Sequence, residues 1–354
     1  MEERVIFTNA PGEEIDSIAG EAGATQIFVI ADTNTEALCL PLLRDQSTAV
    51  ATARVLTVSP GDANKNIDTA TALWRALGNA GATRRSMVVN LGGGMVSDLG
   101  GFVASTFKRG MRYINVPTTL LGAVDAAVGG KTGINFGGLK NEIGVFGHPE
   151  ATIVGTCFFG TLPLVELQSG YGEILKHALL SGPEALSEVL GSNVADISAD
   201  TMLRLLRDSI QLKMRIVESD PTERGPRKAL NFGHTVGHAF EAIAIERGTP
   251  VPHGYAVARG CVVEMILSHM QLAMPTAPLY RVAAYVKENY GAQPLSCDDY
   301  PQLMQLMRHD KKNASADAIN FTLLKNPGEP VTDCTAPATD IETALDIYRD
   351  IMGA

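Results

Sequence analysis

The sequence predicts an α/β, Rossmann-like domain over residues 1–160 and a mostly α-helical domain over residues 161–354. In the first part, strand-like and helix-like stretches alternate with glycine turns between them, which is the βαβ pattern of a parallel sheet. In the second part, segments with a 3.6-residue apolar period dominate. The length of 354 residues also favours two domains, because one hydrophobic core rarely organises so long a chain.

The N-terminal domain is predicted from three short apolar runs and one helix. Residues 26–31 (QIFVIA) and 86–91 (SMVVNL) have the composition of buried strands, and a further strand at 113–117 (YINVP) ends at a proline. Between the first two runs, residues 67–80 carry apolar side chains at helical spacing. Strand, helix and strand in this order favour a parallel sheet.

The C-terminal domain is predicted from its helical periodicity, which marks residues 163–181, 183–191, 200–218, 228–246, 254–271 and 278–289. A strand follows at 318–324 (AINFTLL). The last helix should begin at a capping box formed by Thr339 and Glu342 and should run to about Ile351. A cleft between two domains is the usual place for a site, and we expect one here.

Composition excludes several classes of partner. The formal net charge of -10 opposes binding to nucleic acid or to an anionic membrane surface. No apolar run reaches the ~18 residues that a membrane span needs, and the start, MEERVIF, carries no apolar export segment, so we expect a cytoplasmic protein. The five cysteines are scattered without a C-x-x-C spacing and should be buried, reduced thiols: Cys39, Cys157, Cys261, Cys297 and Cys334.

A glycine turn follows the strand at 86–91. Residues 92–94 are three glycines that open a predicted helix, where backbone amides and the helix dipole favour a pyrophosphate. Because Ser97 occupies the last glycine position of the G-x-G-x-x-G pattern, the turn is typical both of dinucleotide binding and of a plain tight turn. Asp32, at the end of the first strand, could bond ribose hydroxyls or cap the next helix.

A second group of residues has the composition of a metal site. His234 and His238 lie four residues apart on one helix face, His253 follows, and Glu173 is an acid in an otherwise apolar helix. One glutamate and two histidines are a common catalytic zinc set that leaves a coordination position open. Histidines at this spacing are also often only solvated or hydrogen-bonded. Thr235 stands where the H-E-x-x-H protease signature requires a glutamate, which excludes that class.

Basic residues form a third group, several of them in apolar or glycine-rich stretches where a solvated charge is unexpected. Any one of them alone would be a surface charge, but together they favour an anion-binding pocket. The set comprises Lys108, Arg109, Lys131, Lys140, Lys176, Lys213, Arg227, Lys311 and Lys312.

Seven motifs, taken in order, resemble the dehydroquinate synthase family of the sugar-phosphate cyclase superfamily. The motifs are LGGGxVxD at 91–98, VPTTLL at 116–121, VGGKTG at 128–133, LKN at 139–141, GEILK at 172–176, NFGHTxGHA at 231–239 and HGxAV at 253–257. The chain departs from the family where Ala126 and Ala127 follow Asp125 in place of two serines. A further departure is Tyr255, which follows the His-Gly pair in place of glutamate.

The resemblance implies the two-domain dehydroquinate synthase-like fold, with NAD bound by the first domain. The adenosine part would be held by Asp32 and Asn34 and by the 60–65 loop, through Asp62, which replaces the family's glutamate, and Lys65. The pyrophosphate and nicotinamide side would contact Gly94, Met95, Val96, Ser97 and Asp98. The cofactor site would be completed by Thr118, Thr119, Asp125, Lys131, Lys140, Phe158 and Thr161.

The resemblance also implies one divalent ion, zinc or cobalt, bound by Glu173, His234 and His253. His238 would then face the substrate and not the metal. The substrate would be held by Lys131, Asn141, Lys176, Lys213, Arg227, Asn231, His238 and one of Lys311 and Lys312. Arg109 would reach the neighbouring subunit's site, which implies a homodimer.

The implied reaction is the shikimate-pathway step that converts 3-deoxy-D-arabino-heptulosonate 7-phosphate to 3-dehydroquinate and phosphate. In this family it proceeds by transient oxidation with NAD, phosphate elimination, re-reduction and intramolecular aldol closure, which makes the enzyme a phosphorus–oxygen lyase. The alternatives are a sister cyclase that forms an inosose or a valiolone, and a metal-dependent polyol dehydrogenase of related fold. A non-catalytic NAD- or metal-binding regulator would need no such dense set of polar residues.

Overall fold

The structure is a computed structural model that describes residues 4–220, 223–308 and 319–354. The described chain packs into two compact units. Unit 1 comprises Met1–Pro163 and Ser198–Ile210, and unit 2 comprises Leu164–Ile197 and Gln211–Ala354. The helix α9 (Ala199–Ser219) contributes residues to both units. An α/β part with a parallel sheet and a mostly helical part are the fold class that the sequence predicts.

Unit 1 is built on a parallel sheet whose strands, within the described ranges, follow the order β1-β8-β5-β4-β2-β3. These strands are β1 (Val5–Phe7), β2 (Gln26–Asp32), β3 (Arg54–Val58), β4 (Ser86–Gly92), β5 (Arg112–Pro117) and β8 (Ala151–Val154). From β2 the chain passes outward to β3 and then returns to β4 on the other side of β2, so the strand order reverses there. Open parallel sheets bind ligands at such a reversal, beyond the carboxyl ends of the strands.

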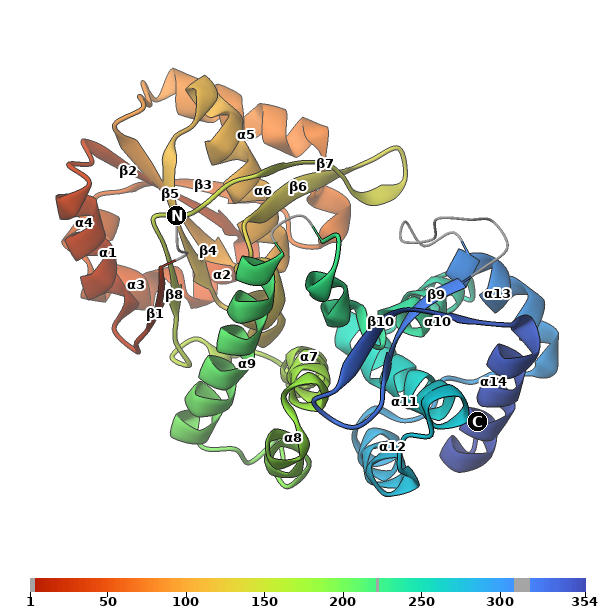
Figure 1. Cartoon of the computed structure of the whole chain (residues 1–354). Helices are drawn as coiled ribbons and strands as arrows, with labels where there is room; N and C mark the ends of the chain where they lie inside the picture. The colour runs from red at the N-terminus through yellow and green to blue at the C-terminus, as the bar shows by residue number, and fades with distance from the viewer. Residues whose placement is uncertain (1–3, 221–222, 309–318) are drawn as a thin grey trace. The chain divides into compact units, whose positions relative to one another are not determined.

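The sheet has helices on both faces, which explains why its strands are continuous apolar runs in the sequence. Ile27 and Val29 of β2 point to the face covered by α1 (Pro11–Glu21), α3 (Leu40–Gln46) and α4 (Thr48–Ala51). Phe28 and Ile30 point to the opposite face, covered by α5 (Ile67–Asn79) and α6 (Gly94–Thr106). Figure 1 shows the sheet between these two helical layers.

A separate antiparallel hairpin in unit 1 consists of β6 (Lys131–Phe136) and β7 (Leu139–Phe146). Its turn is Gly137-Gly138, with φ of 60° and 82°, and glycine adopts such positive φ values without steric cost. The hairpin exposes large apolar side chains, since Phe136, Leu139 and Phe146 are 53%, 55% and 66% exposed. It is labelled in Figure 1.

Unit 2 is organised around α11 (His253–Leu272), whose residues from Ala256 to Ser268 are all buried. The helices around it in the described chain are α7 (Leu164–Ser181), α8 (Pro183–Leu190), α10 (His234–Glu246), α12 (Thr276–Tyr290), α13 (Tyr300–Arg308) and α14 (Ala338–Met352). One antiparallel hairpin joins them, formed by β9 (Ile319–Leu324) and β10 (Pro330–Ala336). Because α11 is buried on every side along this stretch, it has no periodic polar face.

Two predictions about helices are wrong. The predicted helix over 228–246 is a 3₁₀ turn, Pro226–Asn231, followed by α10, and the break falls at Gly233 with φ 78°. The last helix does not start at a capping box. Pro337 is the N-cap residue of α14, and Thr339 lies inside the first turn. A proline has its φ already fixed near the helical value, so the helix can begin directly after it.

The remaining predictions divide as follows. All five cysteines are free and two are buried, but Cys157 and Cys334 are partly exposed and Cys297 is exposed, so the expectation of buried thiols is wrong for these three. The strands β1, β3, β6, β7, β8 and β10 were not predicted. Within the described ranges, none of the helices combines the length and the apolar character that a membrane crossing requires.

Candidate functional site

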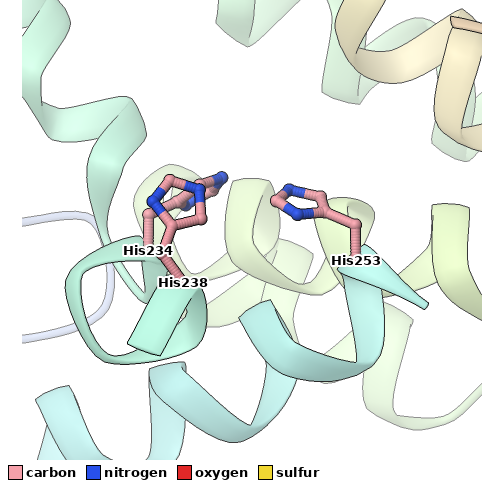
Figure 2. A group of neighbouring side chains, drawn as sticks. All are labelled: His234, His238 and His253. Atoms are coloured by element: carbon pink, nitrogen blue, oxygen red, sulfur yellow. The ribbon is translucent and has the colours of Figure 1, made fainter. Parts of the chain in front are cut away.

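Three helices of unit 2 bring the predicted metal ligands together. Glu173 lies on α7, His234 and His238 lie in the first two turns of α10, and His253 is the first residue of α11. Figure 2 shows the three imidazole rings gathered in one place. One nitrogen from each ring belongs to a group whose members all lie within 4.8 Å of one another.

Glycines beside these residues allow the helix backbones to touch. A Cβ atom on Gly254 would lie 1.7 Å from the Ser169 carbonyl oxygen of α7, and one on Gly172 would lie 2.3 Å from the Gly254 oxygen. A Cβ atom on Gly237 would lie 3.0 Å from the Ala256 oxygen of α11. Each of these glycines is the chain neighbour of Glu173, His238 or His253, so the close approach of the helices fixes where these three side chains begin.

Glu173 is the centre of the group. Its side chain is fully buried (0% exposed), yet its Oε1 lies 3.2 Å from His234 Nε2 and 3.4 Å from His253 Nε2. Its Oε2 lies 2.6 Å from Lys176 Nζ. Burial opposes ionisation of this carboxyl group, but the positive charge of Lys176, together with the contacts to His234 and His253, outweighs burial and holds its pKa well below the usual value.

Both imidazoles beside Glu173 are oriented through their other nitrogen. His234 Nδ1 lies 3.2 Å from the Phe232 carbonyl oxygen, and His253 Nδ1 lies 3.1 Å from Glu241 Oε2. The Nε2 atoms are therefore directed at Glu173 in both cases. A metal-binding histidine characteristically has its second nitrogen held in this way by a carbonyl or carboxylate group.

The two histidines that share the Glu173 carboxylate have pKa values shifted in opposite directions. Burial, assisted by the positive charge of Lys176, lowers the pKa of His234 to about 4. Burial also disfavours the charged form of His253, but hydrogen bonds to Glu173 and Glu241 outweigh it and raise its pKa to about 10. His253 is therefore the more basic of the two imidazoles and lies between two carboxylates, and it has to release its proton before it can bind a divalent cation.

The donor set fits a divalent metal ion of the zinc type. The buried Glu173 carboxylate lies 2.6–3.4 Å from the nitrogens of Lys176, His234 and His253, and within the described residues no hydroxyl or backbone amide bonds to it. Buried carboxylate oxygens ordinarily have such partners, and a metal ion would satisfy both. The geometry accommodates two ligand sets, since His238 completes a group of three histidines while Glu173 joins His234 to His253.

Buried cationic side chains accompany this group in unit 2. Lys176, Lys213 and Arg227 are only 2%, 6% and 4% exposed. Lys176 also donates a hydrogen bond to the Leu230 carbonyl oxygen (3.0 Å), and Asn231 Nδ2 donates to Glu223 Oε1 (2.9 Å). Lys176 and Asn231 are therefore oriented by the protein, and burial excludes Lys213 and Arg227 as ordinary surface charges. Lys311 and Lys312 lie outside the described residues.

The loop that leads to Arg227 is organised by one carboxylate. Asp220 accepts hydrogen bonds from the backbone amides of Arg224 (3.1 Å), Gly225 (2.6 Å) and Arg227 (3.3 Å). Burial opposes the charged form of Asp220, but these backbone bonds lower its pKa below the usual value. Asp220 was not predicted as a site residue, because a single acid at a helix end has no distinctive sequence signal.

In unit 1, the predicted cofactor residues surround the reversal of strand order. Ala31 of β2 pairs with Leu91 of β4, so Asp32 and the glycine turn lie side by side. Gly93 is the N-cap of α6 and no side chain caps the helix, while a Cβ atom on it would lie 3.0 Å from Thr119. Met95 and Val96 follow in the first turn of α6. A glycine turn at this point of a parallel sheet suits a pyrophosphate.

Asp32 adopts the capping arrangement that the sequence left open. Its Oδ1 accepts hydrogen bonds from the backbone amides of Asn34 and Thr35, both at 2.9 Å, and it begins α2 (Thr33–Leu38). The Thr35 hydroxyl bonds back to Asp32, which completes a capping box. Asn34 is exposed beside it.

A buried lysine links residues that the sequence assigned to different ligands. Lys65 Nζ, in a residue only 5% exposed, donates to Asp98 Oδ2 (2.9 Å) and to Asn141 Oδ1 (2.6 Å). Asp62 lies 3.4 Å from the same ammonium group. Three predicted cofactor residues and one predicted substrate residue thus form one network in unit 1.

The remaining predicted residues of unit 1 differ in how far they are buried. Thr118, Ser97 and Phe158 are buried, and the Phe158 side chain packs in the core under the sheet, while Asp125 is partly exposed. The exposed residues are Lys131 and Lys140 of the hairpin, Thr161 after β8, and Arg109. Arg109 and Lys108 have φ of 67° and 51°, which is an uncommon conformation for residues with a side chain.

Glu241 is a site residue that sequence reasoning missed. It lies three residues after His238 on α10, and its carboxylate is the partner of His253 Nδ1. A glutamate one turn beyond a histidine motif is common on helix surfaces, so the sequence alone gave no reason to select it.

Comparisons with family models and with curated proteins find the same similarity along the chain. Two family models match in succession, 3-dehydroquinate synthase N-terminal over residues 55–169 and 3-dehydroquinate synthase C-terminal over residues 170–313. A curated 3-dehydroquinate synthase of Parabacteroides distasonis is 44% identical over 352 residues, which covers 99% of this chain and 99% of the relative.

Solved structures extend the likeness to the fold. A 2-deoxy-scyllo-inosose synthase complexed with carbaglucose-6-phosphate, NAD+ and Co2+ has a TM-score of 0.83 at 23% identity, with 98% of this chain and 96% of that chain covered. The 2-epi-5-epi-valiolone synthase of Streptomyces hygroscopicus subsp. jinggangensis, with NAD+ and Zn2+ bound, has a TM-score of 0.84 at 23% identity, with 99% and 97% covered. At this identity the likeness establishes a shared fold.

Proposed function

The chain belongs to the 3-dehydroquinate synthase family, and we propose that it converts 3-deoxy-D-arabino-heptulosonate 7-phosphate to 3-dehydroquinate and phosphate, using NAD and one divalent ion. The reaction makes it a phosphorus–oxygen lyase. The observation that carries the proposal is Glu173, a buried carboxylate shared by two oriented imidazoles. The proposed ligand set is Glu173, His234 and His253, because one oxygen of the buried Glu173 carboxylate lies 3.2 Å and 3.4 Å from the Nε2 atoms of the two imidazoles.

Residues of unit 2 hold the substrate in this proposal. When bound, NAD supplies reversible hydride transfer and the divalent ion supplies Lewis acidity at substrate oxygens. The buried cations Lys176, Lys213 and Arg227 provide the positive charge that a carboxylate and a phosphate require, and they stabilise the charge that develops as phosphate departs. His238 is exposed, with its ring 5.3 Å from that of His234, so it suits a hydrogen bond to a substrate hydroxyl.

Unit 1 binds NAD in this proposal. The glycine turn and the start of α6 suit the pyrophosphate, because uncapped amides at a helix N-terminus attract phosphate oxygens. Lys65 and Asp98, already bonded to each other, form a preorganised polar group beside this turn. Asp32 keeps its Oδ1 on the helix α2, so a ribose hydroxyl would have to share that carboxylate.

A homodimer completes the proposal, with Arg109 acting in the neighbouring subunit's site. The β6–β7 hairpin exposes Phe136, Leu139 and Phe146, and apolar side chains gathered in this way are typical of a surface that another chain covers. Mixing an Arg109→Ala protein with a His253→Ala protein tests whether Arg109 acts in the neighbouring subunit's site. Activity should reappear in mixed dimers, since one of their sites receives both an intact arginine and an intact metal centre. Two inactive proteins that stay inactive after subunit exchange would contradict it.

The reaction is tested by phosphate release from the heptulosonate phosphate, with and without a chelator. Phosphate and 3-dehydroquinate should form in equal amounts, with no net NADH, and the chelator should abolish both. Parallel incubation with the sugar phosphates from which an inosose and a valiolone would form tests the sister cyclases. Turnover of one of these sugars with no dehydroquinate formed would exclude our assignment, and accumulation of NADH would indicate a polyol dehydrogenase instead.

A further inference from the structure

The helix that carries His234 and His238 begins without a capping side chain of its own. Gly233 is its N-cap residue and the third helical residue is Val236. In a capping box, the N-cap side chain accepts from the third amide, and the third side chain accepts from the N-cap amide. Glycine and valine can do neither.

Glu264 of α11 supplies both halves of this arrangement from another helix. Its Oε2 accepts a hydrogen bond from the Gly233 amide (2.6 Å), and its Oε1 accepts one from the Val236 amide (3.2 Å). The side chain is fully buried at 0% exposed. A buried carboxylate bonded to two amides at the positive end of a helix is held firmly, because breaking either bond would leave a buried polar group unpaired.

Lack of space explains why the cap comes from α11. A Cβ atom on Gly233 would lie 2.4 Å from Cys261 Sγ, and one on Gly260 would lie 2.1 Å from the Gly233 oxygen. The backbones of α10 and α11 are therefore in direct contact where α10 begins. No capping side chain fits at Gly233, and the acceptor has to reach in from one turn further along α11.

We propose that Glu264 is a positioning residue of the metal centre, because it sets where α10 begins relative to α11. His234 is the first residue of α10 and His253 the first of α11, and their Nε2 atoms lie 3.2 Å and 3.4 Å from the same Glu173 oxygen. That spacing depends on the two helices keeping one relative position. Glu264 acts through the backbone amides of Gly233 and Val236, and the inference rests on the metal site proposed above.

The test compares Glu264→Gln and Glu264→Asp with Tyr348→Phe. Glutamine keeps one acceptor oxygen but turns an NH2 group toward an amide, and aspartate keeps the charge but is one methylene shorter. Tyr348→Phe removes a buried hydrogen bond from the Gln293 amide (2.8 Å) elsewhere in unit 2, and so controls for lost stability. The measurements are the Zn2+ dissociation constant by chelator competition, the visible spectrum of the Co2+-loaded protein, the NAD dissociation constant and the melting temperature.

Both Glu264 variants should bind Zn2+ about 10- to 100-fold more weakly and change the Co2+ spectrum, with NAD affinity unchanged. Tyr348→Phe should lower the melting temperature and leave metal affinity unchanged. Wild-type Zn2+ affinity and an unaltered Co2+ spectrum in the Glu264 variants would overturn the inference while leaving the metal site in place. Absence of Zn2+ binding by the wild-type chain would overturn both. If the glutamine variant does not fold, the aspartate variant decides alone.

Discussion

Gly254→Ala is the smallest change that should disturb the metal centre without touching a ligand. Gly254 follows His253 directly, and an alanine Cβ there would lie 1.7 Å from the Ser169 carbonyl oxygen and 2.6 Å from its carbonyl carbon. These are backbone atoms of α7, so no side chain can rotate away to make room. The two helices have to move apart, and Glu173 is carried on α7.

The geometry sets the size of the effect. A carbon atom rests against a carbonyl oxygen at about 3.3 Å or more, so relief requires a shift of about 1.6 Å. Metal–ligand distances tolerate only about 0.2 Å, so a shift of this size takes Glu173 out of range of an ion held by His253. We expect metal affinity to fall by about 100-fold, the upper end for loss of a supporting contact. Overpacking should also lower the free energy of unfolding by about 1–3 kcal/mol.

The measurements are the Zn2+ dissociation constant and the thermal unfolding of the metal-free protein. Gly78→Ala in α5 is the matched control, because a Cβ atom on Gly78 would meet no atom within 4 Å. That control should leave metal binding unchanged and stabilise the protein by up to about 1 kcal/mol, the helix-propensity difference between the two residues. If Gly254→Ala bound Zn2+ as tightly as the wild type, the close contact between α7 and α11 would not position the ligands.

Three further predictions concern single side chains. His238→Ala should leave Zn2+ affinity within about tenfold while lowering kcat/KM; a loss of Zn2+ binding as severe as that of His253→Ala would make His238 a ligand. Glu241→Ala should weaken Zn2+ binding by about 10- to 100-fold, because His253 Nδ1 loses its hydrogen-bond partner. The measurement is chelator titration, and an unchanged Zn2+ affinity would show that Glu241 does not support His253. Asp16 accepts hydrogen bonds from Ser47, Thr48 and Ala49, and these bonds outweigh burial and lower the pKa of its carboxyl group below 3.8. The stabilisation of the folded protein by Asp16 should therefore be complete above pH 3.8 and should disappear as the pH falls through the lowered pKa. Asp16→Asn should therefore cost about 1 kcal/mol at neutral pH, and melting curves of the two proteins should converge in acid; a constant difference across pH would contradict this.

Long elements with a strong apolar pattern were predictable from the sequence. The strands at 26–31 and 86–91 and the helix at 67–80 match β2, β4 and α5 to within a residue or two. The failures occur where tertiary contacts override local signals. The predicted helix over 228–246 breaks at Gly233, because the chain must turn there for α10 to lie against α11. Short strands such as β3 and β8 have too few residues to show a period.

The candidate site was predictable as a set of residues but not as an arrangement. Motif resemblance selected Glu173, His234 and His253, and in the structure the Nε2 atoms of both histidines lie within 3.4 Å of Glu173 Oε1. Resemblance could not select Glu241 or Glu264, because their partners are 12 residues and about 30 residues away in the chain. Hydrogen bonds over such separations exist only once the helices have packed.

The order of apolar and turn residues by itself determined a parallel α/β part and a helical part. The ionisable residues of the sequence by themselves indicated a site suited to a metal and an anion. Only the tertiary structure decided that one carboxylate serves two imidazoles, that each imidazole is held by a different kind of partner, and that α10 is capped from α11. The physical reason is that local sequence sets backbone preferences over a few residues. The spacing of ligands depends on how closely glycine-lined helices approach, and that distance belongs to the pair of helices and to neither one alone.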